Sequence, residues 1–248
     1  MKSKEKNLKE MTLIDHLSEL RKRLIWCFGY IIVIFIVCFY FADKLFAFLA
    51  DPLVKLMDRE HGQGFIYTAL QEAFFTELKV AFFFALFFSF PVIAIQIWKF
   101  IAPGLYANEK GFVLPLVLFS FLSFSSGILF SYFILIPYCL NFFTSLSGDT
   151  VLNNFSINHY FSFIIWMLLG SGIVFQLPVI SFLLSIIGLL TPPFMRHYRR
   201  HSIVAIFILS SFITPPDPVS MLVMALPLII LYEISIGISW LVNRSNGN

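Results

Sequence analysis

Charge and hydrophobicity are strictly segregated along this chain of 248 residues. Of its 31 charged residues, only Glu233 falls within any of six long apolar runs. These runs cover residues 24–42, 80–98, 112–143, 160–187, 203–213 and 219–242. A hydrocarbon core of about 30 Å requires about 20 apolar residues in a helix, and no run shows the alternation of a membrane strand. The pattern predicts a single all-α integral membrane domain over residues 1–248.

The Lys and Arg residues predict how this domain is oriented. Seven precede the first run, two lie between the second and third, three lie between the fourth and fifth, and one follows the sixth. The alternate loops contain four, none and none. By the positive-inside rule the basic segments face the cytoplasm, which gives six transmembrane helices with both termini inside. The net charge of +3 then reports topology and not nucleic-acid binding.

Proline positions and one short run predict an irregular bundle. Prolines within or near the runs bend helices, so a kinked, concave bundle is expected, with ordinary kinking as the open alternative. These are Pro91, Pro115, Pro137, Pro178 and Pro227. The fifth run reaches only about 16 Å as a helix. Asp217 can cap the helix that follows, with Pro218 in its first turn. Short fifth and sixth helices would locally thin the bilayer.

Two segments outside the runs carry helical apolar patterns. Residues 1–23 are expected to contain an amphipathic cytoplasmic segment at the interface, with the stripe Leu13, Leu17, Leu20 and Leu24. Residues 43–79 are expected to form a structured cap on the outer side, with the stripe Leu45, Phe46, Phe48, Leu49, Leu53 and Leu56. The N-terminus shows no cleavage site or transit-peptide pattern, so the first run is expected to be a retained anchor.

The sequence contains no recognisable catalytic or cofactor-binding pattern, and we expect neither enzymatic activity nor a cofactor. The three cysteines have no CxxC spacing and are expected to be apolar fillers. His197 and His201 have the spacing of a helical metal pair. Because Arg196, Arg199 and Arg200 lie around them and would repel a dication, no metal site is predicted.

Three acids are candidates for function. Glu19 is placed to pair with Arg23 at i, i+4, and Glu109 is placed to compensate a helix dipole; on spacing alone these structural roles are favoured. Glu233 is the one acid within the apolar runs, which makes it a functional candidate by default. A neutral Glu233 hydrogen-bonded to Gln96 or Gln176 is an equally good interpretation.

Six segments, in this order, resemble the TatC family, the polytopic subunit of the twin-arginine protein translocase. The segments are His16 to Leu24, Glu72 to Lys79, Gln96 to Tyr106, Phe175 to Pro178, Thr214 to Asp217, and Tyr232 to Ile234. They span nearly the whole chain. One departure is Gln176, because many family members have a glutamate there; a mechanism that needs a titrating carboxylate at this position would not apply to this chain.

The resemblance implies a receptor for twin-arginine signal peptides that nucleates a complex exporting folded proteins with the proton-motive force. It implies signal-peptide binding by Glu19 and Glu109, with Arg21 and Phe100 in support. It further suggests Glu233, Gln176 and Gln96 as intramembrane polar or docking residues, and Glu72 and Asp217 as outer-side functional residues.

Partners implied by the resemblance are signal peptides, the single-span subunits TatA and TatB, the lipid bilayer and further copies of the chain. A bacterial inner membrane is expected, and an organellar membrane less so. Two alternatives stay open at this point. One is a secondary transporter of a small solute or ion, which would need buried polar groups near the midplane. The other is a structural membrane subunit of a larger enzyme.

Overall fold

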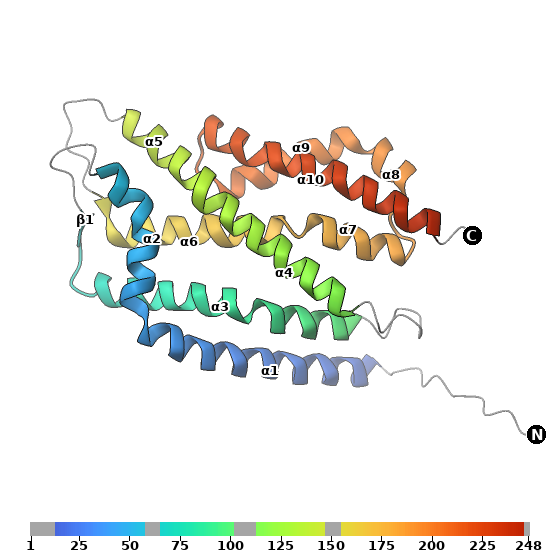
Figure 1. The fold of residues 1–248 in the computed structure, drawn as a ribbon, viewed down its shortest axis with the longest axis horizontal. Helices are drawn as coiled ribbons and strands as arrows, with labels where there is room; N and C mark the ends of the chain where they lie inside the picture. The colour runs from blue at the N-terminus through green and yellow to red at the C-terminus, as the bar shows by residue number, and fades with distance from the viewer. Residues whose placement is uncertain (1–12, 58–64, 102–112, 147–154, 246–248) are drawn as a thin grey trace, which may run out of the picture.

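The computed structural model describes residues 13–57, 65–101, 113–146 and 155–245 and is built almost entirely from helices (Figure 1). The helices are α1 (Leu13–Tyr40), α2 (Ala42–Met57), α3 (Glu72–Ile101), α4 (Val113–Phe130), α5 (Ile136–Leu146), α6 (Ile157–Val174), α7 (Leu177–Ile186), α8 (Pro192–His197), α9 (Arg199–Ile213) and α10 (Pro218–Ser245). A π-helical turn, η3 (Ser131–Leu135), joins α4 to α5. The core contains Phe83, Phe161, Ile164, Met167, Leu168, Met224 and Leu228.

Five helical segments of the described chain are long and apolar enough to cross a membrane. They correspond to the first, second, third, fourth and sixth apolar runs. The expectation of a short sixth helix is wrong, because α10 has 28 residues. The fifth run forms α9, which has 15 residues and so starts one turn earlier than its apolar run. The additional turn contains Arg199 and Arg200, whose charges excluded it from the apolar run. At about 1.5 Å per residue, α9 reaches about 22 Å, still less than the hydrocarbon thickness.

The N-terminal amphipathic stripe belongs to a membrane helix. Residues 13–23 form the first turns of the continuous helix α1 and are not a separate helix. Their location at the membrane interface stays a prediction. α1 packs against α3 and is otherwise mostly exposed, with Trp26 and Phe28 among its exposed side chains. Exposed apolar residues on a spanning helix face lipid, so this surface needs no protein cover.

Two ends of the bundle can be distinguished in Figure 1. At one end, α1 begins, α3 ends, α4 begins and α10 ends. We call this the basic end, because its described residues include Arg21, Lys22, Arg23, Lys99, Arg196, Arg199 and Arg200. We call the opposite end, where α2 and the β-strands lie, the cap end. The positive charge is thus concentrated at one end of the molecule.

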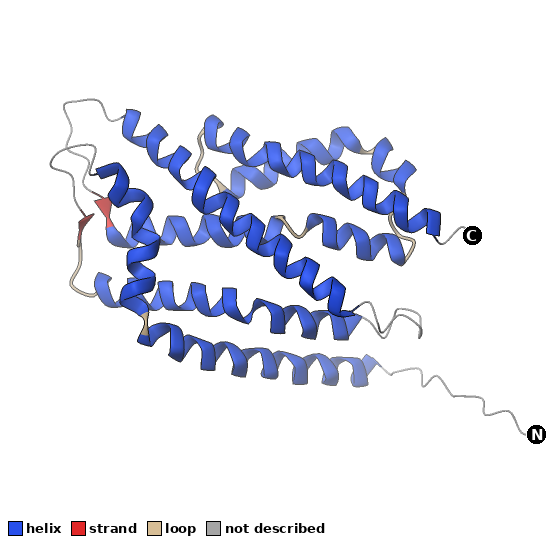
Figure 2. Ribbon diagram, in the orientation of Figure 1, coloured by secondary structure: helices blue, strands red, loops and turns tan. Residues whose placement is uncertain are grey.

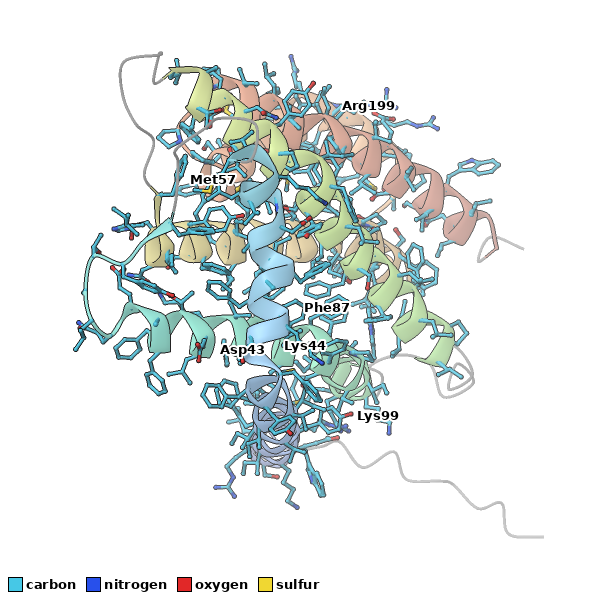
Figure 3. All side chains as sticks on the ribbon, turned by 60° about the vertical axis from the view of Figure 1, so that its left-hand side comes forward. Asp43, Lys44, Met57, Phe87, Lys99 and Arg199 are labelled. Atoms are coloured by element: carbon cyan, nitrogen blue, oxygen red, sulfur yellow. The ribbon has the colours of Figure 1, made fainter. Side chains whose placement is uncertain are left out.

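At the cap end, α2 lies across the other helices, with Asp43 and Met57 near its two ends (Figure 3). Most of the expected stripe faces the bundle, because Leu49 and Leu53 are almost fully buried. The inclusion of Phe48 is wrong, since this residue is 51% exposed. Pro52 lacks the N–H that would bond to the Phe48 carbonyl. The hydroxyl of Tyr132 donates to this carbonyl at 2.7 Å, and Tyr160 donates to the Leu49 carbonyl at 3.1 Å. Two phenols from the bundle therefore hold α2 in place.

Two very short strands join the chain segments beside α2. β1 (Phe65–Ile66) pairs in parallel with β2 (Phe155–Ser156), as the red segments in Figure 2 show. The sequence excluded strands as spanning elements and did not indicate this pair. Two residues are too few for a recognisable alternating pattern. The pair connects the segment before α3 with the segment before α6.

We expect Tyr132→Phe and Tyr160→Phe each to destabilise the protein. Each change removes one hydroxyl and with it one hydrogen bond to a carbonyl of α2, which costs about 0.5–1.5 kcal/mol. Thermal unfolding of the purified protein in detergent would show a lower midpoint for both variants. Tyr138→Phe is the matched control, because Tyr138 is exposed. Equal midpoints for all three variants would contradict the assigned role of the two phenols.

Candidate functional site

Glu19 lies in the second turn of α1 and pairs with Arg23 in the next turn. Arg23 Nε donates to Glu19 Oε1 at 3.0 Å, and Arg23 Nη2 contacts the same oxygen. The side chains of Arg23 and Glu19 are 21% and 25% exposed. The pairing expected from the i, i+4 spacing is confirmed, and it is better shielded than most surface ion pairs.

The same guanidinium also connects α1 to α3. Arg23 Nη1 donates to Gln96 Oε1 at 3.1 Å, and Nη2 donates to the Lys99 carbonyl at 3.3 Å. Both acceptors lie in the last two turns of α3, where the helix dipole favours a cation. We call Glu19, Arg23, Gln96 and the Lys99 carbonyl the arginine cluster. Gln96, considered above as a partner of Glu233, belongs to this cluster instead.

The other predicted signal-peptide residues lie around the arginine cluster or outside the described residues. Arg21 is exposed on α1, two residues before Arg23. Phe100 is half-buried in the last turn of α3 and directly follows Lys99. Glu109 falls within residues 102–112, which the structure does not describe. Glu19, Arg21 and Phe100 are therefore at the basic end.

Gln176 lies where the fourth apolar run is broken. The helix α6 ends at Val174 and α7 begins at Leu177, with Pro178 in its first turn. Two hydrogen bonds join this break to α4. Gln176 Nε2 donates to the Ser120 carbonyl at 3.0 Å, and Ser123 Oγ donates to the Phe175 carbonyl. Trp98 of α3 donates to Ser120 Oγ at 3.2 Å. The uncharged Gln176 thus supports a helix break by hydrogen bonding.

Glu233 has a cationic partner. Its Oε2 accepts a hydrogen bond from Arg199 Nη2 at 2.7 Å, and both side chains are 48% exposed. The alternative partners Gln96 and Gln176 are wrong, since each is bonded elsewhere. This pair was not predicted, because Arg199 precedes the fifth apolar run and lay outside the segments considered as spans. Lys99 and Arg199 lie on different sides of the bundle in Figure 3, so this pair and the arginine cluster are separate.

Glu72 and Asp217, the two outer-side candidates, each stabilise the start of a helix. Glu72 begins α3 and accepts the Thr68 N–H at 2.8 Å through Oε2, while the Thr68 hydroxyl contacts Oε1. Asp217 precedes α10 and accepts the Ser220 N–H at 2.6 Å. The capping role expected for Asp217 is confirmed. Both residues are largely buried, at 7% and 6% exposure.

One polar contact between helices was missed by the sequence analysis. Lys79 of α3 donates to Asn158 Oδ1 and, at 2.8 Å, to Ser162 Oγ of α6. The chain places these residues about 80 positions apart, so no local pattern could have indicated the contact. Within the described ranges, no group of three or more His, Cys, Asp or Glu side chains could hold a metal ion.

Comparison with known proteins gives a consistent result over most of the chain. The family model for the Sec-independent protein translocase protein TatC matches residues 15–227. The TatC protein of Desulforapulum autotrophicum is 42% identical over 222 residues, which cover 90% of this chain and 82% of that protein. The TatC protein of Escherichia coli strain K12 is 37% identical over 224 residues, covering 90% and 86% respectively.

The fold agrees with the sequence comparison. A crystal structure of the twin-arginine translocase receptor TatC is similar with a TM-score of 0.77 and 35% identity, and the match covers 92% of this chain and 99% of that chain. A second structure of this receptor, in the detergent DDM, has a TM-score of 0.78. The chain belongs to the TatC family and is a multi-pass subunit of the Sec-independent protein translocase.

Proposed function

We propose that this translocase subunit binds twin-arginine signal peptides at its basic end, through Glu19 together with Glu109, Arg21 and Phe100. The observation that carries the proposal is the half-buried carboxylate of Glu19, which already accepts two N–H groups of a guanidinium. A planar guanidinium suits a carboxylate and neighbouring carbonyl oxygens better than the compact ammonium of lysine does. The geometry therefore favours arginine as the recognised side chain.

The specificity of binding tests this proposal. The purified full-length protein is titrated with a fluorescent signal peptide that carries Arg-Arg, and with the same peptide carrying Lys-Lys. We expect the Lys-Lys peptide to bind at least about tenfold more weakly, because it loses paired hydrogen bonds to charged acceptors. Equal affinities would show that the basic end does not read guanidinium groups.

We further propose six spans with both termini in the cytoplasm of a bacterial inner membrane, with α9 as the remaining span. The start of α1 and the end of α10 at the same, positively charged end support this topology (Figure 1). The relatives named above are bacterial, which supports a bacterial membrane as the location of this protein. TatA, TatB and further copies of the chain are the proposed partners, and the proton-motive force is the proposed energy source.

Two polar positions are the proposed contacts for single-span partners. Glu233 and its partner Arg199 are half-exposed on α10 and α9, within reach of a neighbouring helix. The second position is Gln176, whose side chain bonds to α4 at the break between α6 and α7. In this proposal, Glu72 and Asp217 maintain the cap end by fixing the starts of α3 and α10.

Lengthening α9 tests whether its short length matters for transport. Four leucines inserted after Ile208 would extend the helix by about 6 Å and bring it close to the hydrocarbon thickness. If the mismatch between α9 and the bilayer contributes to translocation, export should fall by about tenfold or more. Signal-peptide affinity should be unchanged, because α9 and the arginine cluster lie on different sides of the bundle (Figure 3). Normal export in cells would contradict the thinning hypothesis.

A further inference from the structure

We infer that Arg23 is an internal occupant of the signal-peptide site, and that a guanidinium of the bound peptide takes its place. The inference rests on the proposed function and adds a regulatory step to it. In the structure, the arginine cluster is already a complete guanidinium-binding pocket, and the residue that fills it belongs to the chain itself.

The contacts of Arg23 define this pocket. All three guanidinium nitrogens donate, and the acceptors are the Glu19 carboxylate, the Gln96 side-chain amide and the Lys99 carbonyl. These three acceptors come from two helices, and they include one full negative charge and the negative end of the α3 dipole. Only a planar side chain with several donors in a fixed fork can satisfy them together.

A peptide guanidinium would therefore meet acceptors that are already arranged and partly shielded from water. Arg23 lies near the start of α1, at the basic end, and its long, flexible side chain is 21% exposed, so it can swing toward the solvent without moving α1. Exchange of one guanidinium for another leaves no acceptor unpaired. The ligand then does not have to desolvate Glu19 and Gln96 at the moment of binding.

The internal occupant sets a threshold for binding. An apparent dissociation constant equals the intrinsic one divided by the fraction of molecules whose site is free. Displacing Arg23 thus weakens every ligand of the pocket by the same factor, and only ligands with a high intrinsic affinity bind at cellular concentrations. A lysine peptide, which cannot reproduce the contacts of Arg23, falls below the threshold.

This mechanism has a signature that a purely structural role of Arg23 lacks. In Arg23→Gln, the dissociation constants of the Arg-Arg and Lys-Lys peptides should both fall, by the same factor of about three to ten. Arg23→Lys keeps a cation beside Glu19 but loses the planar guanidinium with its several donors. Its affinities for both peptides should therefore lie between those of the wild type and those of Arg23→Gln. If Arg23 instead served only to orient Glu19, both variants would bind the Arg-Arg peptide more weakly.

The measurement uses the full-length protein in detergent, and each variant must elute as a monodisperse peak before it is titrated. Lys22→Gln is the matched control, because Lys22 is exposed on the same helix and its loss changes the net charge equally. A gain in Arg23→Gln no larger than that in Lys22→Gln would overturn the inference, as would any loss of affinity. If Arg23→Gln does not yield folded protein, an affinity of Arg23→Lys equal to or weaker than that of the wild type overturns it.

Glu19→Gln made in the Arg23→Gln protein separates the inference from the proposed function, because no internal guanidinium then competes with the peptide. If this double variant binds like Arg23→Gln, the carboxylate is not the receptor group and the proposed function itself fails. If it binds more weakly than Arg23→Gln, while the Arg23 variants bind more weakly than the wild type, the site is correct and only the displacement of Arg23 is wrong.

Discussion

Replacing Gly127 by alanine is expected to lower the free energy of unfolding by about 1–3 kcal/mol. Gly127 lies where α4 crosses α6. A Cβ at this position would lie 2.7 Å from the Ser171 carbonyl oxygen and 2.9 Å from Phe175 Cβ. A backbone oxygen cannot move away as a flexible side chain can, so α4 and α6 would have to separate. Small residues commonly permit such close helix crossings in membranes.

The expected loss at Gly127 has a control in the same chain. Gly29 of α1 has no neighbouring atom within 4 Å of the position that a Cβ would take. Gly29→Ala should leave stability unchanged or raise it slightly, since alanine is the better helix former. Thermal unfolding in detergent measures both variants. If Gly127→Ala unfolds at the same temperature as Gly29→Ala, the close crossing of α4 and α6 is not required for stability.

In a protein that carries Arg23→Gln, and so has no competing internal guanidinium, Glu19→Gln is expected to reduce the affinity for an Arg-Arg signal peptide by about ten- to a hundredfold. The glutamine keeps the shape of the side chain but loses the negative charge, and hydrogen bonds to charged groups contribute about 1.5–3 kcal/mol each. Export of a folded cargo in cells should fall accordingly. The protein should still fold, because both replacement side chains are neutral and the side chains of Arg23 and Glu19 are both partly exposed.

A second acid controls for the loss of negative charge. Glu77 lies near the start of α3, at the cap end, and Glu77→Gln changes the net charge by the same amount. Made in the Arg23→Gln protein, Glu77→Gln should leave the affinity for the Arg-Arg peptide equal to that of Arg23→Gln alone. Similar losses in both variants would show that the overall charge matters and not the position of Glu19.

Five of the six predicted spans match helices that are long and apolar enough to cross a membrane, because the lengths of apolar runs can be read directly from a sequence. The capping role of Asp217 and the pair of Glu19 with Arg23 were also predictable, since both depend on neighbours within four residues. The TatC family match decides against a small-solute transporter and an enzyme subunit, and the chain is a non-enzymatic component of a translocase.

The contacts that were not predicted join distant parts of the chain. Arg23 reaches acceptors more than 70 positions away, and Glu233 finds Arg199 on a preceding helix. The π-helical turn is a further example. It contains Tyr132, whose hydroxyl satisfies the carbonyl that Pro52 leaves free. Such pairs depend on how helices pack, and a single sequence contains no local signal for them.

Photocrosslinking of a signal peptide to defined positions tests the central claim most directly. A photoreactive residue replaces Leu20, beside Glu19, or Ile97, beside Gln96; at Val54, on α2 of the cap end, it provides the control. We expect the Arg-Arg peptide to crosslink to the first two positions and not to Val54, and the Lys-Lys peptide to lose these crosslinks. Equal crosslinking of both peptides, or crosslinks only at Val54, would contradict recognition of guanidinium groups at the basic end.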